Sequence, residues 1–179
     1  QAGLIRQVLS IIIEGQLWDL SYFTPERVGV ETEAETLLYT YRVAGCVGEF
    51  WTRLGYATMG AAFCDPAPER RDLMLQAGVR YGRGLQLINI LRDRVEDAQR
   101  GRRYLPEGAD IEKWMDRAGR YLEDGIDYSS RLRRFKLRFA TVLPALIGLR
   151  TLELMRRHPQ HPKVKIPRRS VYAAMLKAA

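Results

Sequence analysis

Four polar side chains spaced three and four residues apart have the types and the spacing of a metal site. They are Gln86, Asn89, Asp93 and Asp97, in a segment that is otherwise largely apolar. On an α-helix these steps place all four on one face, over about three turns. Two carboxylates at i and i+4 repel by a few tenths of a kcal/mol, and a divalent cation would reverse that sign. Mg²⁺ keeps several waters and binds together with substrate phosphates, so this polar stripe indicates a Mg²⁺–diphosphate site.

The common explanation for two carboxylates on a helix is a solvated face, with Asp93 paired to Arg92 or Arg94. The two amides of the stripe argue against it, because amides that face a core need partners. The residues beyond the stripe point the same way, since Gly101 is expected to end the helix and several arginines flank it. Guanidinium groups match phosphate oxygens. These arginines are Arg100, Arg102 and Arg103.

The polar stripe lies near the end of a helix expected from Pro68 to Arg100. Nearly all of the remaining chain is also predicted to be helical, without strands or repeats. The other helices are expected at about 4–20, 31–59, from 110 onward, 128–157 and 168–176. Pro144 should kink the helix that contains it.

Two glycines inside the predicted 31–59 helix, Gly45 and Gly48, cost about 1 kcal/mol each relative to alanine. Small residues at these positions let another helix, or a ligand chain, approach closely. Tight helix packing alone would explain them without any ligand, and both explanations stay open.

Two segments resemble the squalene/phytoene synthase family, the head-to-head prenyl transferases. The run LQLINILRDRVEDAQRGRRYLP, residues 85–106, is similar to the family's second aspartate-rich motif. The run YTYRVAGCVGE, residues 39–49, is similar to its Y-x-x-Y-V-A-G-x-V-G helix, with Arg42 where a tyrosine is common. Weaker agreement extends from residue 14 to residue 146.

The resemblance implies roles for the polar residues. Asp93 and Asp97 match the metal-binding aspartates, and Asn89 matches an amide position near metal and diphosphate. Tyr39 matches a tyrosine that assists proton transfer or stabilises a cation, although a core tyrosine is equally compatible with the sequence. The other matched positions near the diphosphate are Gln86, Arg92 and Arg102.

The resemblance also implies a lining for the prenyl chains, formed by Val43, Ala44, Gly45 and Val47. Tyr104 matches the aromatic residue of an R-x-Y-L-P segment and is expected to be structural or to contact substrate. Asp19 fits a family position with a weaker match, and Glu96 is expected to be solvated.

From the same resemblance we expect an all-α, isoprenoid synthase-type helical bundle around a central cavity. The implied reaction is a Mg²⁺-dependent head-to-head condensation of two farnesyl or geranylgeranyl diphosphates through a cyclopropylcarbinyl diphosphate. The product would be squalene, dehydrosqualene or phytoene, with NADPH used if it is squalene. The D-D-x-x-D pattern of head-to-tail chain-elongating synthases is absent from the sequence.

The sequence departs from the family pattern at its start. The first aspartate-rich motif should precede Leu4, and no D-x-x-x-D occurs before residue 39. We therefore expect residues 1–179 to be a single helical domain that is incomplete at its amino end, and weakly active or inactive alone. The alternative is a non-catalytic relative that acts as a binding or assembly protein.

The charge of the chain is unevenly distributed. The net charge is +8, and the residues from Arg131 onward contain about thirteen Lys and Arg but a single acid, Glu153. A basic third could contact anionic lipid, anionic substrate or nucleic acid, or simply solubilise helix faces. No nucleic-acid-binding motif is present, so we expect no nucleic-acid partner and favour peripheral membrane contact. The sequence carries no indication of oligomeric state.

Smaller features are consistent with a cytoplasmic protein, in peripheral contact with the inner face of the membrane. Cys46 and Cys64 lack metal-ligand spacing and are expected to be reduced core residues. The apolar stretch at 139–149 is too short to span a bilayer. His158 and His161 lie in a proline-rich loop and are not expected to bind metal.

Overall fold

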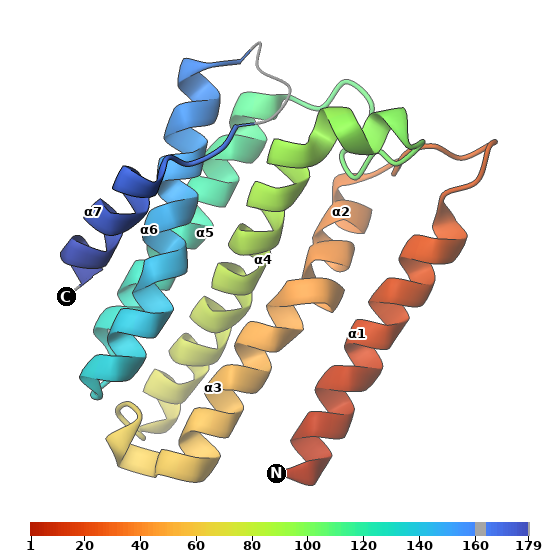
Figure 1. The fold of residues 1–179 in the computed structure, drawn as a ribbon. Helices are drawn as coiled ribbons and strands as arrows, with labels where there is room; N and C mark the ends of the chain where they lie inside the picture. Colours follow the sequence, from red (N-terminus) through yellow and green to blue (C-terminus); the bar gives the residue numbers. More distant parts are fainter. Residues whose placement is uncertain (160–163, 179) are drawn as a thin grey trace.

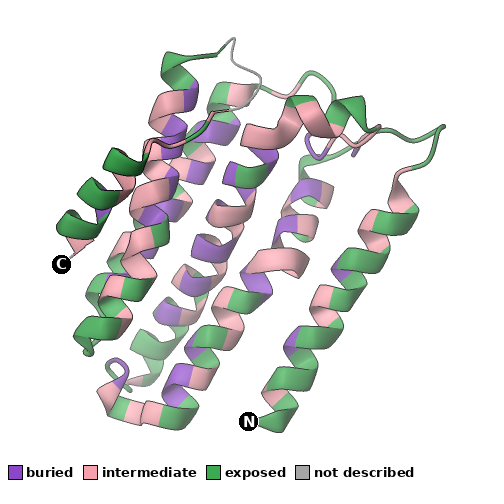
Figure 2. Ribbon diagram, in the orientation of Figure 1, coloured by how far each residue is buried: buried purple, intermediate pink, exposed green. Residues whose placement is uncertain are grey.

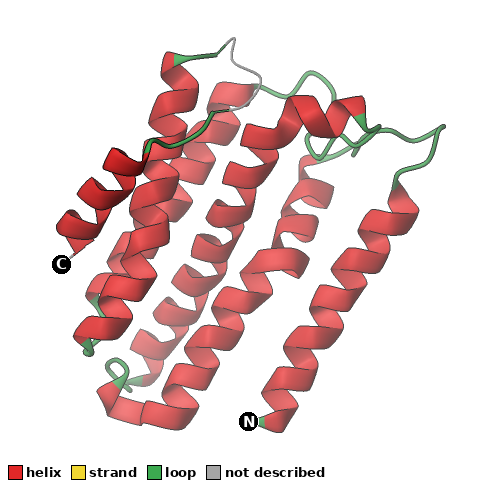
Figure 3. Cartoon of the chain, viewed as in Figure 1, coloured by secondary structure: helices red, strands yellow, loops and turns green. Residues whose placement is uncertain are grey.

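The structure of the chain is a computed structural model that describes residues 1–159 and 164–178. Within these residues it is all-α, as the sequence predicts, and Figure 3 shows helices joined by short connections. The α-helices are α1 (Ala2–Tyr22), α2 (Glu33–Thr40), α3 (Cys46–Met59), α4 (Pro68–Gln99), α5 (Ile111–Ser130), α6 (Phe135–Arg157) and α7 (Arg168–Ala178). The β-type contacts in the described part are isolated bridges, Thr24 with Arg27 and Gly29 with Arg103.

The helix that carries the polar stripe, α4, is the longest in the described chain and runs through the middle of the bundle (Figure 1). Pro68 opens it at the first helical position, where a missing N–H costs nothing. Gly101 follows its end with a φ of +74°, so the helix ends where the sequence predicts. α5 and α6 pack on α4 from one side and α3 from the other, while α1 packs on α3 and α7 on α6.

The helix predicted over 31–59 is interrupted. α2 begins at Glu33, where Thr32 and Glu35 form a capping box. A five-residue π-helical segment, Tyr41–Gly45, then joins α2 to α3. A π turn accommodates an extra residue within a helix, and such turns are frequent at functional sites.

The sequence predicts a helix over 128–157, and its predicted start is wrong. Tyr128 belongs to α5, where its ring is buried and its hydroxyl lies 2.9 Å from Oγ1 of Thr52. The chain turns at residues 131–134, with Leu132 buried, and α6 begins at Phe135. No glycine or proline marks this turn in the sequence. Pro144 lies inside α6, as predicted.

The crossing of α3 and α4 explains the glycines of the motif. A Cβ added to Gly48 would lie 1.9 Å from the carbonyl oxygen of Gly78. A Cβ added to Gly82 would lie 2.3 Å from the carbonyl oxygen of Ala44. The close approach predicted at this helix is therefore made by α4, whose backbone lies against the motif.

Buried residues follow the inner faces of the helices, most clearly on α4 (Figure 2). Cys46 and Cys64 are both buried and free, as predicted. No helix in residues 1–159 or 164–178 combines the length and the hydropathy needed to cross a membrane. His158 follows α6, and the rest of the proposed histidine loop, at 160–163, lies outside the described residues.

Candidate diphosphate site

The polar stripe lies on the last third of α4. The opposite face of this part of the helix is anchored by Leu87, Ile90 and Leu91, which are almost completely buried. Gln86 is half-buried and Asn89 is exposed, and neither amide has a hydrogen-bond partner among the described residues. Both amides are thus available to a ligand, although they do not face the core.

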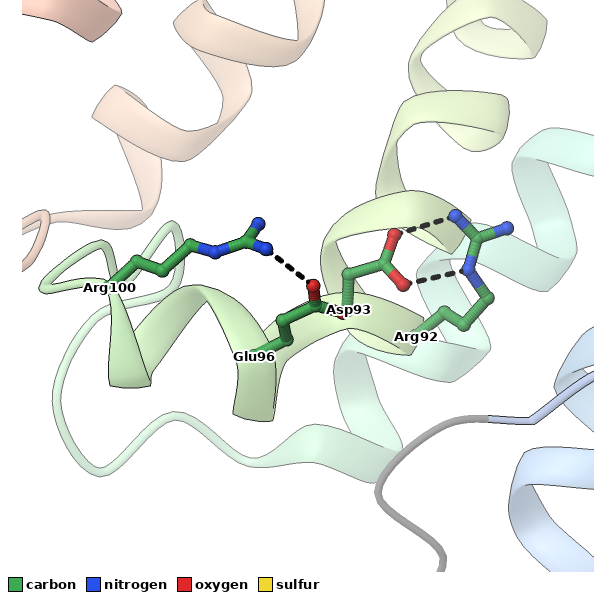
Figure 4. A network of polar contacts seen from close by, with 4 residues as sticks. All are labelled: Arg92, Asp93, Glu96 and Arg100. Atoms are coloured by element: carbon green, nitrogen blue, oxygen red, sulfur yellow. Dashed lines mark hydrogen bonds and ion pairs between the residues drawn. The ribbon is translucent and has the colours of Figure 1, made fainter.

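Asp93 is held by its neighbour in the sequence (Figure 4). Arg92 donates from Nε to Oδ1 of Asp93 over 3.0 Å and from Nη2 to Oδ2 over 2.6 Å. Arg94 instead donates to the carbonyl oxygen of Leu91. The simple pairing considered for Asp93 is therefore present, and its partner is Arg92. This ion pair does not exclude a metal ion at Asp93. The side chain of Arg92 is partly exposed, so its guanidinium could bind the diphosphate instead of Asp93.

Glu96 forms a separate ion pair on the same helix. Its Oε1 accepts from Nη2 of Arg100 over 2.7 Å, one turn further along (Figure 4). Both side chains are well exposed, so the expectation of a solvated Glu96 holds with the addition of this partner. Such a pair contributes little to stability.

Asp97 lies in a less favourable environment. Burial raises the pKa of its carboxyl group, the charge of Asp93 raises it further, and Arg100 opposes the shift. The negative charge of Asp93 thus disfavours ionisation of Asp97, which is the arrangement that a divalent cation would relieve.

The donor set at the stripe fits Mg²⁺ bound together with a phosphate group. Asp93 and Asp97 supply carboxylate oxygens and Asn89 an amide oxygen, while no group of three His, Cys, Asp or Glu in the described residues could hold a metal. Mg²⁺ commonly binds through one or two carboxylates and completes its octahedron with water and phosphate oxygens. A protein cage of many ligands is therefore not required.

A second cluster, which we call the Asp19 hub, joins α1, α2 and the loop after α4. Nη1 of Arg102 donates to Oδ2 of Asp19 over 2.8 Å, and the hydroxyl of Tyr104 donates to Oδ1 over 2.5 Å. The ring of Tyr39 stacks on that of Tyr104, with centroids 4.8 Å apart. Thr36 fixes the loop from the other side by donating to the carbonyl oxygen of Tyr104.

The hydroxyl of Tyr39 is kept in its neutral form. Burial and the nearby Asp19 carboxylate raise its pKa to about 12. The same group is close enough to sense the charges of Asp97 and Arg102, which links the Asp19 hub to the polar stripe. Tyr39 can therefore donate a hydrogen bond near neutral pH, but it cannot act as an anionic base.

Asp19 is the site residue that the sequence undervalued. Its side chain is 15% exposed, and it orients both Arg102 and Tyr104. Its partners lie more than eighty residues further along the chain, so no local pattern connects them. The only available signal was its weak match to a family position.

An open cavity of about 690 Å³ lies between α4, α6 and the segment that leads into α7. Asn89 and Arg92 stand at its polar part, and its wall along α6 is formed by Ala140, Leu143 and Ile147. The wall is predominantly apolar. This cavity borders the polar stripe, because Asn89 belongs to both.

The four residues expected to line a prenyl cavity do not line this one. Gly45 is buried against α4, where an added Cβ would lie 3.2 Å from Arg83 and 3.3 Å from the carbonyl oxygen of Val79. Val43 packs against Gly15 of α1, and Ala44 faces Gly82 of α4 with its carbonyl. Val47 is 42% exposed. Their role in binding a prenyl chain stays a prediction.

Comparisons with known proteins agree with these features. A family model described as squalene/phytoene synthase matches residues 1–109. A phytoene synthase of Arthrospira platensis is 43% identical over 100 residues, which are 53% of this chain and 29% of that protein. A squalene synthase of Gibberella zeae is 29% identical over 154 residues, which are 74% of this chain and 32% of that protein.

Solved structures show the same fold. A complex of TcSQS with a ligand superposes with a TM-score of 0.77 at 22% identity, covering 98% of this chain and 55% of that one. A dehydrosqualene synthase in complex with a ligand gives a TM-score of 0.74, covering 96% of this chain and 63% of that one. The expected isoprenoid synthase-type helical fold is confirmed. The chain spans about a third of the length of the two sequence relatives, and 55% and 63% of the two structures.

Proposed function

Since the chain belongs to the squalene/phytoene synthase family, we propose that the protein condenses two prenyl diphosphates head to head. The observation that carries the proposal is the polar stripe of α4. It presents Asn89, Asp93 and Asp97 along one face, beside an apolar cavity that could accept a hydrocarbon chain. Farnesyl and geranylgeranyl diphosphate are the proposed substrates, and squalene, dehydrosqualene or phytoene the proposed product.

We propose that Asp93, Asp97 and Asn89 hold Mg²⁺ at the diphosphate. Bound there, Mg²⁺ would neutralise charge on the diphosphate and so make it a better leaving group. Arg92 lies beside the stripe and at the cavity, where its guanidinium could exchange the carboxylate of Asp93 for phosphate oxygens. Gln86, one turn earlier, supplies a free amide for orientation.

We expect the Asp19 hub to bind the departing diphosphate and to stabilise the allylic carbocation that its departure leaves. Arg102 is fixed by Asp19 rather than free, so its positive charge has a defined place at the edge of the site. Tyr39 presents a neutral hydroxyl that can donate to a diphosphate oxygen. The stacked rings of Tyr39 and Tyr104 also offer a π-face to a nearby carbocation.

The apolar wall of the cavity would exclude water and hold a prenyl chain during this reaction. An allylic cation reacts with water unless the site excludes it, and the second prenyl chain must be held close to the cation. Leu85, Ile88 and Leu143 supply such a surface. The use of NADPH belongs to the proposal only for a squalene product.

Product analysis tests the proposal directly. The protein encoded by the complete gene is incubated with farnesyl or geranylgeranyl diphosphate, with and without Mg²⁺ and NADPH. We expect a Mg²⁺-dependent product with a carbon skeleton of twice the substrate length. Binding of both diphosphates without turnover would instead support a non-catalytic binding or assembly protein.

Substitution of Asp93 makes the test specific. Asp93→Ala should lower kcat by about 10²–10³-fold, because it removes one of the two carboxylates proposed to hold the Mg²⁺ that would neutralise the diphosphate. Glu96→Gln is the matched control, since Glu96 lies on the same helix and forms an ion pair with the exposed Arg100 (Figure 4). Equal activity of Asp93→Ala and the wild type would remove the assignment.

A further inference from the structure

The segment that connects α5 to α6 carries a dense group of positively charged side chains. Residues 131–138, with the sequence RLRRFKLR, form what we call the basic turn. Its five cationic side chains are all exposed, and none forms an ion pair with a carboxylate of the described residues. By contrast, Arg150, Arg156 and Arg157, further along α6, all have carboxylate partners. Simple solubility does not require unpaired cations at this density.

The backbone of the basic turn is held against the protein core by two apolar side chains and a hydrogen bond. Leu132 is 1% exposed and packs in a core cluster with Phe63 and Tyr128, and Leu137 packs against the same cluster. The N–H of Arg133 donates to the carbonyl oxygen of Phe63 over 2.9 Å. The two leucines anchor the segment and the residues between them point to solvent.

An aromatic side chain lies in the middle of these charges. Phe135 is 52% exposed, and its ring centroid is 6.3 Å from that of Phe139 in the next turn. Arg134 and Lys136 flank it in the sequence. An exposed ring within a run of exposed cationic residues is a combination that suits the boundary between lipid headgroups and acyl chains.

The basic turn does not serve the stability of α6. No acidic residue stands in the first turn of this helix, and Arg134 at its N-cap makes no capping hydrogen bond. Cations near a helix N-terminus are disfavoured by the helix dipole. α5, in comparison, begins with Asp110 as a cap and Glu112 in its first turn. The charges are therefore retained at a cost to the fold.

We propose that the basic turn docks the protein on an anionic lipid bilayer, with Phe135 inserted among the headgroups. The turn lies at one end of the bundle, where it connects α5 to α6 (Figure 1). A bilayer surface can contact one end of a bundle, whereas single-stranded nucleic acid is usually bound along a groove. Lipid phosphates complement the five unpaired cations.

The basic turn also leads along α6 to the cavity. Ala140 and Leu143 line the cavity, and Leu143 lies about 12 Å along the helix from Phe135. Docking would bring this apolar end of the cavity close to the bilayer, from which a prenyl chain could enter. This orientation step rests on the proposed function, whereas the docking itself does not.

Vesicle flotation of the full-length protein tests the docking. The probes are vesicles of phosphatidylcholine alone and of phosphatidylcholine with phosphatidylglycerol. Arg133→Gln, Arg134→Gln and Lys136→Gln together remove three charges from the basic turn. The matched control removes three exposed charges elsewhere, by Arg6→Gln, Lys113→Gln and Arg120→Gln. Circular dichroism and thermal melting confirm that each variant is folded.

We expect the wild type to bind only the anionic vesicles. The basic-turn variant should bind them about a hundredfold more weakly, and the control variant less than threefold more weakly. Equal weakening by the two variants would show attraction to net charge alone and would overturn the proposal. Tighter binding to single-stranded DNA than to anionic vesicles, lost in the basic-turn variant, would overturn it in favour of nucleic acid.

Substitution of the ring tests the lipid contact separately from charge. Phe135→Ser should weaken vesicle binding about tenfold at constant charge. Leu9→Ser, at a similarly exposed apolar position on α1, is the control and should have no effect. Equal effects of the two would contradict insertion of Phe135. Vesicle binding needs no turnover, so its failure is distinguishable from failure of the proposed reaction.

Discussion

The ionised carboxylate of Asp97 does not stabilise the folded state. Burial and Asp93 raise the pKa of its carboxyl group, so the folded state holds the proton more tightly than the unfolded chain. Its contribution to stability is therefore present below the unfolded pKa and is lost as the pH rises through the folded pKa. At neutral pH the ionised group is a net cost.

Asp97→Asn should consequently stabilise the metal-free protein at pH 7. We expect a gain of a few tenths of a kcal/mol in the free energy of unfolding, because one repulsive carboxylate is removed. Urea unfolding at pH 7 and at about pH 3.5, below the ordinary pKa of an aspartate, measures it, and the gain should vanish at the lower pH. A destabilised Asp97→Asn at pH 7 would show that the carboxylate is structural.

Asp19 should behave in the opposite way. It accepts hydrogen bonds from Arg102 and Tyr104 while largely buried, so Asp19→Asn should lower the free energy of unfolding by about 1.5–3 kcal/mol. Tyr104→Phe should cost about 1 kcal/mol, and the double variant should lose less than the sum of the two. Asp127→Asn, at an exposed position on α5, controls for loss of a carboxylate. Strict additivity of the two substitutions would mean that the Asp19 hub is not energetically coupled.

The two kinds of site residue differ in how far a sequence can reveal them. The polar stripe lies within one helix, so its spacing alone places Gln86, Asn89, Asp93 and Asp97 on one face. Asp19 and Tyr104 meet only because α1 and the loop after α4 come together, and residue spacing carries no information on that contact. The ion pair of Arg92 with Asp93 was one of two possibilities, and only the structure separates them.

At the level of the elements, periodicity predicted the helices but not their interruptions. The π segment at Tyr41–Gly45 begins and ends with helical dihedrals and contains no proline, so it looks like uninterrupted helix in the sequence. The turn at 131–134 has no glycine or proline, and only the burial of Leu132 reveals why the chain bends there. The glycines, in contrast, correctly predicted a close approach, which α4 makes.

The crossing of α3 and α4 should be intolerant of any side chain at Gly48. In Gly48→Ala the new Cβ would meet the backbone of α4 at 1.9 Å, so the helices must separate. We expect a loss of about 1–3 kcal/mol in the free energy of unfolding. Gly119→Ala on α5, where the nearest atom is 3.8 Å away, should instead stabilise by about 0.5–1 kcal/mol. Thermal unfolding compares the two, and a stabilising Gly48→Ala would contradict the packing described here.

At the scale of the whole molecule, tyrosines that are buried or partly buried in several elements make the stability of the bundle depend on alkaline pH. Burial raises the pKa of the hydroxyl in tyrosines of α2, the π segment and every helix from α3 to α5, as well as in the loop after α4. They are Tyr39, Tyr41, Tyr56, Tyr81, Tyr104 and Tyr128. The folded state therefore keeps these protons at a pH where the unfolded chain releases them. Alkali should unfold the whole bundle cooperatively.

The contribution of a single tyrosine to this loss of stability at alkaline pH can be measured at Tyr39. Its pKa is raised from 10.0 to about 12, so its contribution to stability is complete below pH 10 and is lost as the pH rises to 12. Within that window each such group steepens the fall in the free energy of unfolding by at most about 1.4 kcal/mol per pH unit. Tyr39→Phe should therefore show a shallower decline than the wild type in urea unfolding measured from pH 9 to pH 12. Parallel curves for the two proteins would mean that the Tyr39 hydroxyl ionises as easily in the folded state as in the unfolded chain, and that it is not enclosed by Asp19 and Tyr104.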